Sequence, residues 1–173
     1  VFQFISLGDE LAFRVLDSPE VRLARPLPGI PAEQDLTVRA ARLLKAEADA
    51  ASGVEISVSK RLPMGGGLGG GSSDAATTLV ALNALWGCGL SVDRLAELGL
   101  RLGADVPVFV RGDAAWAEGV GEELEPLELP EPCLLVLVPQ CQVPTGEIFS
   151  APELNRQAPP ITIRNFLSGQ GIN

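Results

Sequence analysis

The sequence contains no histidine and no tyrosine, and only three cysteines in 173 residues: Cys88, Cys133 and Cys141. Without histidine, a Ser-His-Asp or Cys-His mechanism and a cysteine–histidine zinc site are excluded. An odd number of cysteines without paired spacing predicts reduced thiols, not a disulfide framework. These absences indicate a cytoplasmic protein, and we assign no metal ligand from the sequence.

Long apolar runs and an excess of basic charge are also absent. The longest apolar run, residues 133–138, is far too short to cross a bilayer, and no signal segment opens the chain. Lys and Arg number 13 against 22 Asp and Glu, a net charge of −9. Because a protein that coats phosphates is normally basic, we expect neither nucleic acid nor a membrane as a partner.

The sequence does have enough apolar residues, 46%, for a folded core. The chain opens inside the apolar run 1–5 and its only methionine is Met64, so we expect an internal piece of a longer protein that lacks N- and C-terminal parts. From residue 119 onward the composition becomes acidic and rich in proline. We therefore predict two domains, residues 1–118 and an incomplete second domain at residues 119–173.

Hydrophobic periodicity predicts strands and helices in an α+β arrangement. Expected strands are residues 1–7, 11–16, 21–24, 54–62 and 134–138, the last of them buried. Expected helices run from an N-cap at Asp35 to about residue 51, from a cap at Ser72 or Ser73 to about residue 86, and from Ser91 to about residue 102.

A glycine-rich loop between the fourth strand and the second helix is the most informative segment. Residues 65–71 contain six glycines, and two serines follow at the helix start. Glycines let the backbone approach a ligand closely, and a helix N-terminus adds free N–H groups and partial positive charge. Lys60 and Arg61, just upstream, could add to the positive field. Together these features predict an anion site fit for a triphosphate.

Other phosphate loops fit poorly. A Walker loop needs a Gly-Lys-Ser/Thr sequence, which the chain does not contain. A dinucleotide fold would require a strand after the helix, and a protein-kinase loop is a hairpin. Here the loop leads into a helix, which argues against a hairpin. Another helix then follows where a dinucleotide fold would have a strand.

The segment that does fit comprises Pro63, Met64, Gly65, Gly66, Gly67, Leu68, Gly69, Gly70, Gly71, Ser72 and Ser73. It resembles the ATP loop of the GHMP small-molecule kinases, and the runs Gly103–Phe109 and Ala117–Glu122 carry the same likeness. The resemblance implies a two-domain fold: an ATP-binding domain of ribosomal-protein-S5-like topology, and an α+β substrate domain. It also implies ATP and Mg²⁺ as cofactors and a small-molecule substrate, and it leaves a homodimer open.

The resemblance further implies roles for single residues. Asp105, in a Gly-Ala-Asp-Val-Pro segment, would be the catalytic carboxylate that accepts the proton of the attacking hydroxyl; read on its own, it is equally a cap or turn residue. Thr145 and Phe149 match a segment that contacts the cytidine end of the substrate. The family's N-terminal catalytic lysine has no counterpart, so we expect this piece by itself to be inactive. Arg94 stands where related kinases have a magnesium-binding glutamate.

The loop variant is most similar to the members that phosphorylate the 2-hydroxyl of 4-diphosphocytidyl-2-C-methyl-D-erythritol, on the non-mevalonate route to isoprenoids. Two alternatives stay open. The first is another GHMP kinase, acting on homoserine or a sugar. The second is a non-catalytic ATP-binding module on the same fold.

Overall fold

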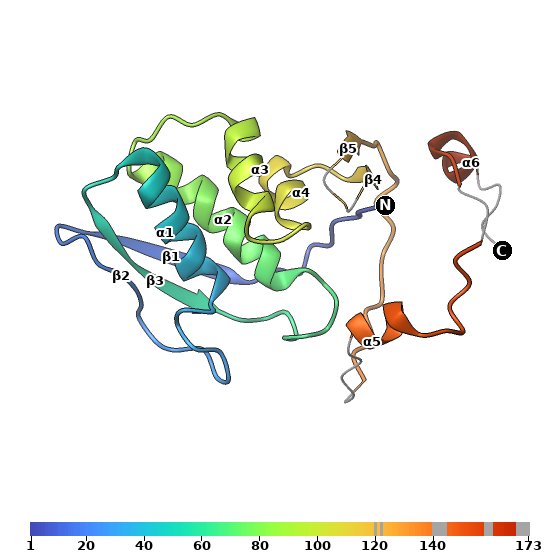
Figure 1. The fold of residues 1–173 in the computed structure, drawn as a ribbon, viewed down its shortest axis with the longest axis horizontal. Coiled ribbons are helices and arrows are strands. Elements are labelled where there is room, and N and C mark those ends of the chain that lie inside the picture. Colours follow the sequence, from blue (N-terminus) through green and yellow to red (C-terminus); the bar gives the residue numbers. More distant parts are fainter. Residues whose placement is uncertain (120, 122, 140–144, 158–160, 169–173) are drawn as a thin grey trace. The chain divides into compact units, whose positions relative to one another are not determined.

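The computed structural model describes residues 1–119, 121, 123–139, 145–157 and 161–168. The chain divides into two compact units, Val1–Val136 and Leu137–Asn173. The first unit contains the glycine loop and Asp105 (Figure 1). The domain boundary predicted after residue 118 stays a prediction.

A three-stranded sheet forms one layer of the first unit, with strands β1 (Glu10–Leu16), β2 (Val21–Leu23) and β3 (Gly53–Ser59). Their order is β1-β3-β2, with β3 antiparallel to β1 and parallel to β2. A Cβ at Gly53 would lie 2.0 Å from the carbonyl oxygen of Glu20. Only glycine therefore lets the turn between β1 and β2 pass so close to the start of β3.

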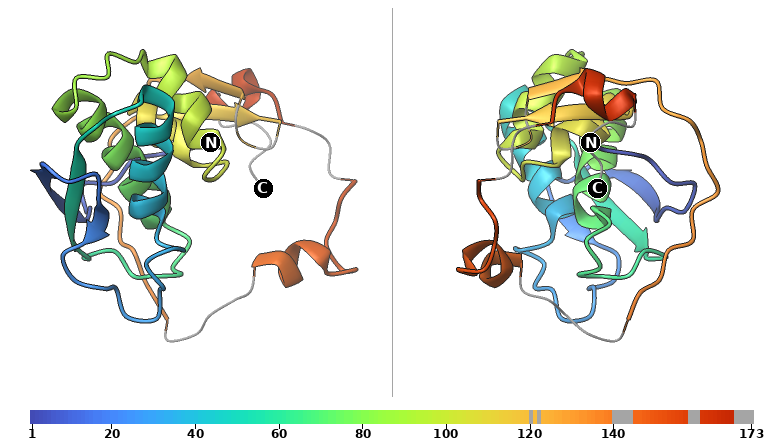
Figure 2. Two further views of the ribbon diagram at one scale, coloured as in Figure 1. Left: turned by 60° about the vertical axis from the view of Figure 1, so that its left-hand side comes forward. Right: turned by 90° about the vertical axis from the view of Figure 1, so that its right-hand side faces the viewer.

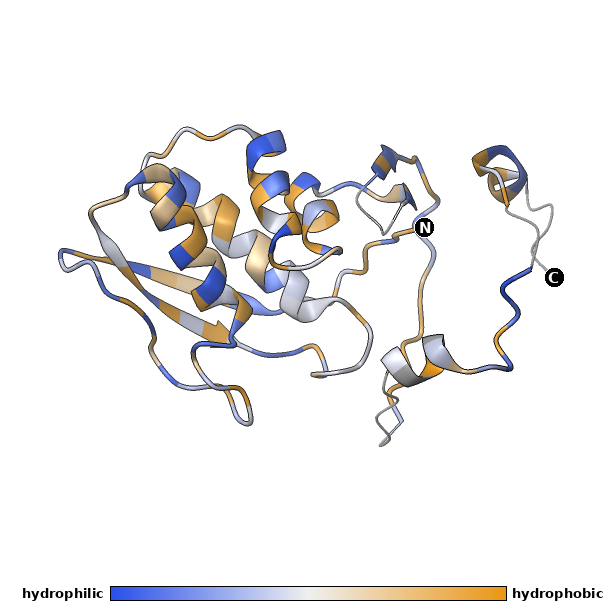
Figure 3. Cartoon of the chain, viewed as in Figure 1, coloured by the Kyte–Doolittle hydropathy of each residue, from blue (hydrophilic) through white to orange (hydrophobic). Residues whose placement is uncertain are grey.

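Four helices accompany the sheet: α1 (Leu36–Ala48), α2 (Gly70–Leu85), α3 (Val92–Leu100) and α4 (Val106–Arg111). Helices α1 and α2 lie side by side over one face of the sheet (Figures 1 and 2). Apolar residues occur along both the strands and the helices (Figure 3). The core is shared by sheet and helices and includes Ala40, Ala41, Leu44, Val54, Ile56, Ala75, Ala76, Leu79, Leu82, Leu95, Leu98 and Val106.

The α+β class and most of the predicted elements are confirmed. The expected strand at residues 1–7 is wrong, since only an isolated bridge joins Phe2 to Ala115. A hairpin of β4 (Ala115–Glu118) and β5 (Glu123–Pro126) was not predicted, because strands of only four residues are too short to show a clear period.

The expected buried strand at residues 134–138 is also wrong. Leu135 and Leu137 are 85% and 79% exposed, and no strand among the described residues pairs with this segment. An apolar run becomes a strand only where a neighbouring strand satisfies its backbone groups and another layer covers its side chains. Neither is provided by the part of the chain that the structure describes.

The second unit contains the short helices α5 (Thr145–Ser150) and α6 (Ile163–Leu167). Within the described residues, no helix has the length and apolar character needed to cross a membrane.

Candidate functional site

The glycine loop joins the end of β3 to the start of α2 and turns by means of left-handed residues. Gly65, Gly67 and Gly69 have φ angles of 73°, 71° and 68°, which side-chain-bearing residues rarely adopt. A Cβ at Gly65 or Gly67 would meet no atom within 4 Å, so these two positions border open space. The loop is therefore open on the side where a ligand would approach.

Most backbone N–H groups of the loop are free. The N–H of Gly66 donates to the carbonyl of Pro63 at 3.3 Å, and that of Ser73 donates to the carbonyl of Gly69 at 2.8 Å. The N–H groups of residues 67–71 donate to no acceptor among the described residues. Since unpaired N–H groups at a helix start attract anions, this arrangement is suited to phosphate.

Helix α2 begins earlier than the sequence predicts. Gly69 occupies the N-cap position without a side-chain hydrogen bond, so the expected cap at Ser72 or Ser73 is wrong. The serines are instead the third and fourth residues of the helix. Because neither hydroxyl is used as a cap, the first turn of α2 keeps its free N–H groups.

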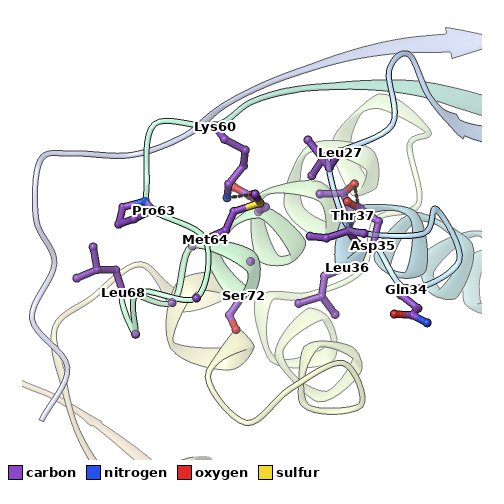
Figure 4. Close-up of a pocket in the computed structure, with 18 residues that line it drawn as sticks. Leu27, Gln34, Asp35, Leu36, Thr37, Lys60, Pro63, Met64, Leu68 and Ser72 are labelled. Carbon is purple, nitrogen blue, oxygen red and sulfur yellow. Dashed lines mark hydrogen bonds and ion pairs between the residues drawn. The ribbon is translucent and has the colours of Figure 1, made fainter. Parts of the chain in front are cut away.

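A pocket of about 400 Å³ lies between the loop and the beginning of α1 (Figure 4). Every residue from Pro63 to Ser72 lines it, whereas Ser73 does not. Apart from the glycines, the apolar side chains of Leu27, Leu36 and Met64 form part of the pocket wall. The pocket thus joins a polar backbone cradle to an apolar surface.

Asp35 stands at the far wall of this pocket and is only 4% exposed. Its carboxylate accepts hydrogen bonds from the backbone N–H of Thr37 at 2.8 Å and of Val38 at 3.3 Å. The predicted N-cap of α1 is thereby confirmed. One carboxylate oxygen is thus already engaged in capping the helix.

A buried charge cluster of Asp9, Lys60 and Asp74 borders the same pocket. The ammonium of Lys60 pairs with Asp9, and with Asp74 at 2.9 Å. The other oxygen of Asp9 accepts the backbone N–H groups of Arg61 at 2.6 Å and Leu62 at 2.8 Å. With two carboxylates around one ammonium, Lys60 adds no net positive charge to the site, contrary to the expectation from sequence.

The environment moves the pKa of each member of this cluster. Burial alone would raise the pKa of Asp9, but hydrogen bonds from Lys60, Leu62 and Arg61 lower it overall. Burial raises the pKa of Asp74 despite its contact with Lys60, and the charges of Asp9 and Asp35 act in the same direction as burial. Burial alone would lower the pKa of Lys60, but its two carboxylate partners raise it. The cluster therefore favours a charged Lys60 and Asp9, and disfavours a charged Asp74.

Asp105 lies at the N-cap position of α4, but its side chain makes no capping hydrogen bond. The residue is exposed, and no described residue forms an ion pair with it. Its loop is close to the start of α2, because a Cβ at Gly103 would lie 4.0 Å from Ser72 Oγ. The carboxylate is thus open to solvent, near the glycine loop but outside the lining of the pocket.

The remaining predicted residues lie elsewhere. Thr145 and Phe149 lie in α5, where the structure describes their backbone but not their side chains. Arg94 pairs with Glu47 and with Glu97 at 2.6 Å on the surface of α3. Sequence reasoning missed the Asp9–Lys60–Asp74 cluster, since its members come from distant segments that show no common pattern.

Comparison with known proteins identifies the family of the segment that contains the glycine loop. Residues 35–113 match the family model described as "GHMP kinases N terminal domain". This part of the chain is a GHMP kinase N-terminal domain. It contains helices α1 to α4 and the whole glycine loop, so the resemblance predicted from the loop is confirmed.

Two relatives of this GHMP kinase domain illustrate the similarity. A Methylococcus capsulatus protein named 4-diphosphocytidyl-2-C-methyl-D-erythritol kinase is 61% identical over all 173 residues, which cover 60% of that protein. A Nitrosococcus oceani protein of the same name is 59% identical, with 99% of this chain and 61% of that protein covered. The chain thus spans about 60% of the length of these curated relatives.

Solved structures agree on the fold of the GHMP kinases. A crystal structure of 4-(cytidine 5'-diphospho)-2C-methyl-D-erythritol kinase matches with a TM-score of 0.68 and 35% identity, over 94% of this chain and 59% of that one. Homoserine kinase from Cytophaga hutchinsonii matches with the same TM-score of 0.68 but 20% identity, over 95% of this chain and 56% of that one. The second likeness concerns the fold alone.

Proposed function

We propose that a full-length protein carrying this chain transfers the γ-phosphate of ATP to the 2-hydroxyl of 4-diphosphocytidyl-2-C-methyl-D-erythritol. The observation that carries the proposal is the glycine loop, which has free N–H groups at residues 67–71 and lines a pocket of about 400 Å³. Relatives that are 57–61% identical bear the name of this kinase, which supports the choice of substrate.

The triphosphate would lie on the loop. The free N–H groups of residues 67–71 and the positive end of the α2 dipole would stabilise its charge. The base and ribose would extend toward the apolar wall of Leu27, Leu36 and Met64. Because Lys60 is held by two carboxylates, most of the attraction for phosphate would come from the backbone.

Asp105 would act as the general base. Its carboxylate would accept the proton of the substrate hydroxyl as that oxygen attacks the γ-phosphorus and the bond to the β–γ bridging oxygen breaks. The lack of a capping hydrogen bond supports this role, since the carboxylate is not engaged by its own helix. The short distance between the Gly103 backbone and Ser72 supports a common site with the loop.

Mg²⁺ would accompany the nucleotide and neutralise charge on its phosphates. No cluster of three or more acidic or cysteine side chains fit for a metal occurs in the described ranges. Mg²⁺ is often bound by few protein groups together with substrate phosphates. We infer that the phosphates provide most of its ligands, with the Ser72 or Ser73 hydroxyl as the contribution of this chain.

Contacts of Thr145 and Phe149 with the cytidine end, a cytoplasmic location, an inactive isolated chain and any homodimer remain predictions. A homoserine or sugar kinase, or a non-catalytic ATP-binding module, are the alternatives from sequence.

The deciding experiment is a phosphotransfer assay of the full-length protein with a panel of alcohols. ATP turnover is expected with 4-diphosphocytidyl-2-C-methyl-D-erythritol and not with homoserine or galactose. Turnover with one of the other alcohols would change the substrate and keep the chemistry. ATP binding without any turnover would favour the non-catalytic module.

A further inference from the structure

We propose that Asp9 is a positioning residue for the glycine loop, acting through Lys60 and through the backbone at residues 61 and 62. The proposal rests on the proposed binding of ATP phosphates to this loop. Asp9 does not line the pocket, so its effect on a ligand would be indirect.

The first step is the contact of Asp9 with the beginning of the loop. Asp9 precedes β1, and its side chain is 1% exposed. One oxygen accepts two consecutive N–H groups, from Arg61 at 2.6 Å and Leu62 at 2.8 Å. Charge-assisted bonds of this kind are short and directional. They fix the direction in which the chain leaves β3 and enters the loop.

The second step links the same carboxylate to the end of the loop. Its other oxygen pairs with Lys60, whose ammonium also contacts Asp74 in the first turns of α2 at 2.9 Å. A Cβ at Gly70 would lie 3.4 Å from Asp9 Oδ2, so the first residue of α2 passes directly beside this carboxylate. The entry and the exit of the loop are therefore held around one buried group.

The loop needs such an external constraint. Between Pro63 and Gly69 only the bond from Gly66 to Pro63 is made within the loop, so its shape depends on how its two ends are held. Stability alone is a weak reason for the cluster, because a buried ion pair often contributes no more than well-packed apolar residues would. A cluster at both ends of a ligand loop is better explained by the placement of the free N–H groups.

Binding of ATP and of adenosine to the full-length protein, measured by calorimetry, tests the proposal. Asp9→Asn keeps the shape and the acceptor oxygen but sets an amide N–H against Lys60. We expect ATP affinity to fall about tenfold and adenosine affinity to stay within about twofold, since only the phosphates use the loop. Removal of a negative charge would by simple electrostatics strengthen ATP binding. The direction of the change in ATP affinity therefore distinguishes positioning from a charge effect.

Glu55→Gln is the matched control, because Glu55, like Asp9, pairs with basic side chains, but its partners are Arg14 and Arg22, away from the pocket. It should leave both affinities unchanged. Asp74→Asn weakens the contact of Lys60 near the start of α2. It provides a second variant should Asp9→Asn fail to fold. The same selective loss of ATP affinity is expected.

The outcomes distinguish a failure of the proposed function from a failure of the proposed role of Asp9. If the unmutated protein binds ATP no better than adenosine, the phosphate loop itself is wrong and the proposed function fails. If the unmutated protein prefers ATP but the variants keep that preference, or lose both ligands equally, the role of Asp9 is overturned.

Discussion

Gly69 lies directly against the ring of Phe109: a Cβ at residue 69 would stand 2.8 Å from Phe109 Cζ and 2.9 Å from Cε2. Gly69 caps α2, and Phe109 belongs to α4, the helix that begins after Asp105. The end of the glycine loop is therefore packed on the helix that follows the proposed base. Phe109 is held in turn by an edge-to-face contact with Phe4, with ring centroids 5.5 Å apart.

Gly69→Val should weaken ATP binding by at least about 2 kcal/mol, because the new side chain meets Phe109 and a φ of 68° is costly for valine. Calorimetric titration of the folded variant measures the loss. Gly87→Val is the control, since Gly87 has a similar φ of 64° but borders open space at the other end of α2. Equal ATP affinities for Gly69→Val and the parent protein would remove the phosphate-loop assignment.

Asp105→Asn in the full-length protein should lower kcat roughly 10²–10⁴-fold and leave ATP affinity nearly unchanged, because loss of a general base acts mainly on the transition state. Steady-state kinetics and ATP titration give the two quantities. Asp113→Asn, at an exposed acid just after α4, should keep full activity. More than half of the parent kcat in Asp105→Asn would assign Asp105 to a local structural role.

Asp74→Asn should change how stability depends on pH. The pKa of Asp74 is raised above 3.8, chiefly by burial, so its ionisation is less favourable in the folded protein than in the unfolded chain. The protonated form of Asp74 therefore stabilises the folded protein fully below pH 3.8, and this stabilisation is lost as pH rises through the raised pKa. The variant does not ionise there, so its stability relative to the parent should increase from about pH 4 to pH 7.

Urea unfolding at several pH values measures this difference. Asp93→Asn, which alters an exposed ion pair with Arg111, is the control and should show no such trend. A difference between Asp74→Asn and the parent that stays constant with pH would contradict the burial argument.

Leu79→Ala should lower the free energy of unfolding by about 2–5 kcal/mol, because Leu79 is completely buried between α2 and its neighbours. Leu85→Ala, on the same helix but 52% exposed, should change it by less than about 0.5 kcal/mol. Chemical denaturation of both variants provides the comparison. Similar losses in the two would contradict the described packing of α2.

Local patterns in the sequence were sufficient for much of the fold. The N-cap at Asp35 and the spacing of apolar residues after it predicted α1, and alternation predicted most of β3. The glycine loop was predicted because its composition is unusual by itself. In each case the determining interactions lie within a few residues along the chain.

Features that depend on distant residues were not predicted. The Asp9–Lys60–Asp74 cluster joins three segments, and residues 8–10 have the local pattern of a turn, which does not indicate a contact with Lys60. Residues 134–138 have the composition of a buried strand, but strand formation depends on a partner. At the start of α2 serine would be the more common cap, but Gly69, in the left-handed conformation, is the N-cap. Ser72 and Ser73 therefore lie inside the helix.

The placement of β3 between β1 and β2 has a consequence for how the molecule folds. Strands β1 and β2 are neighbours in sequence but do not pair with each other. Each pairs with β3, which follows α1 in the chain. Closing so long a segment loses chain entropy before any ladder bond is gained, which slows folding. Asp9 reaches the backbone of residues 61 and 62 only once β1 and β3 have paired. Partly folded chains should therefore lack an ordered glycine loop.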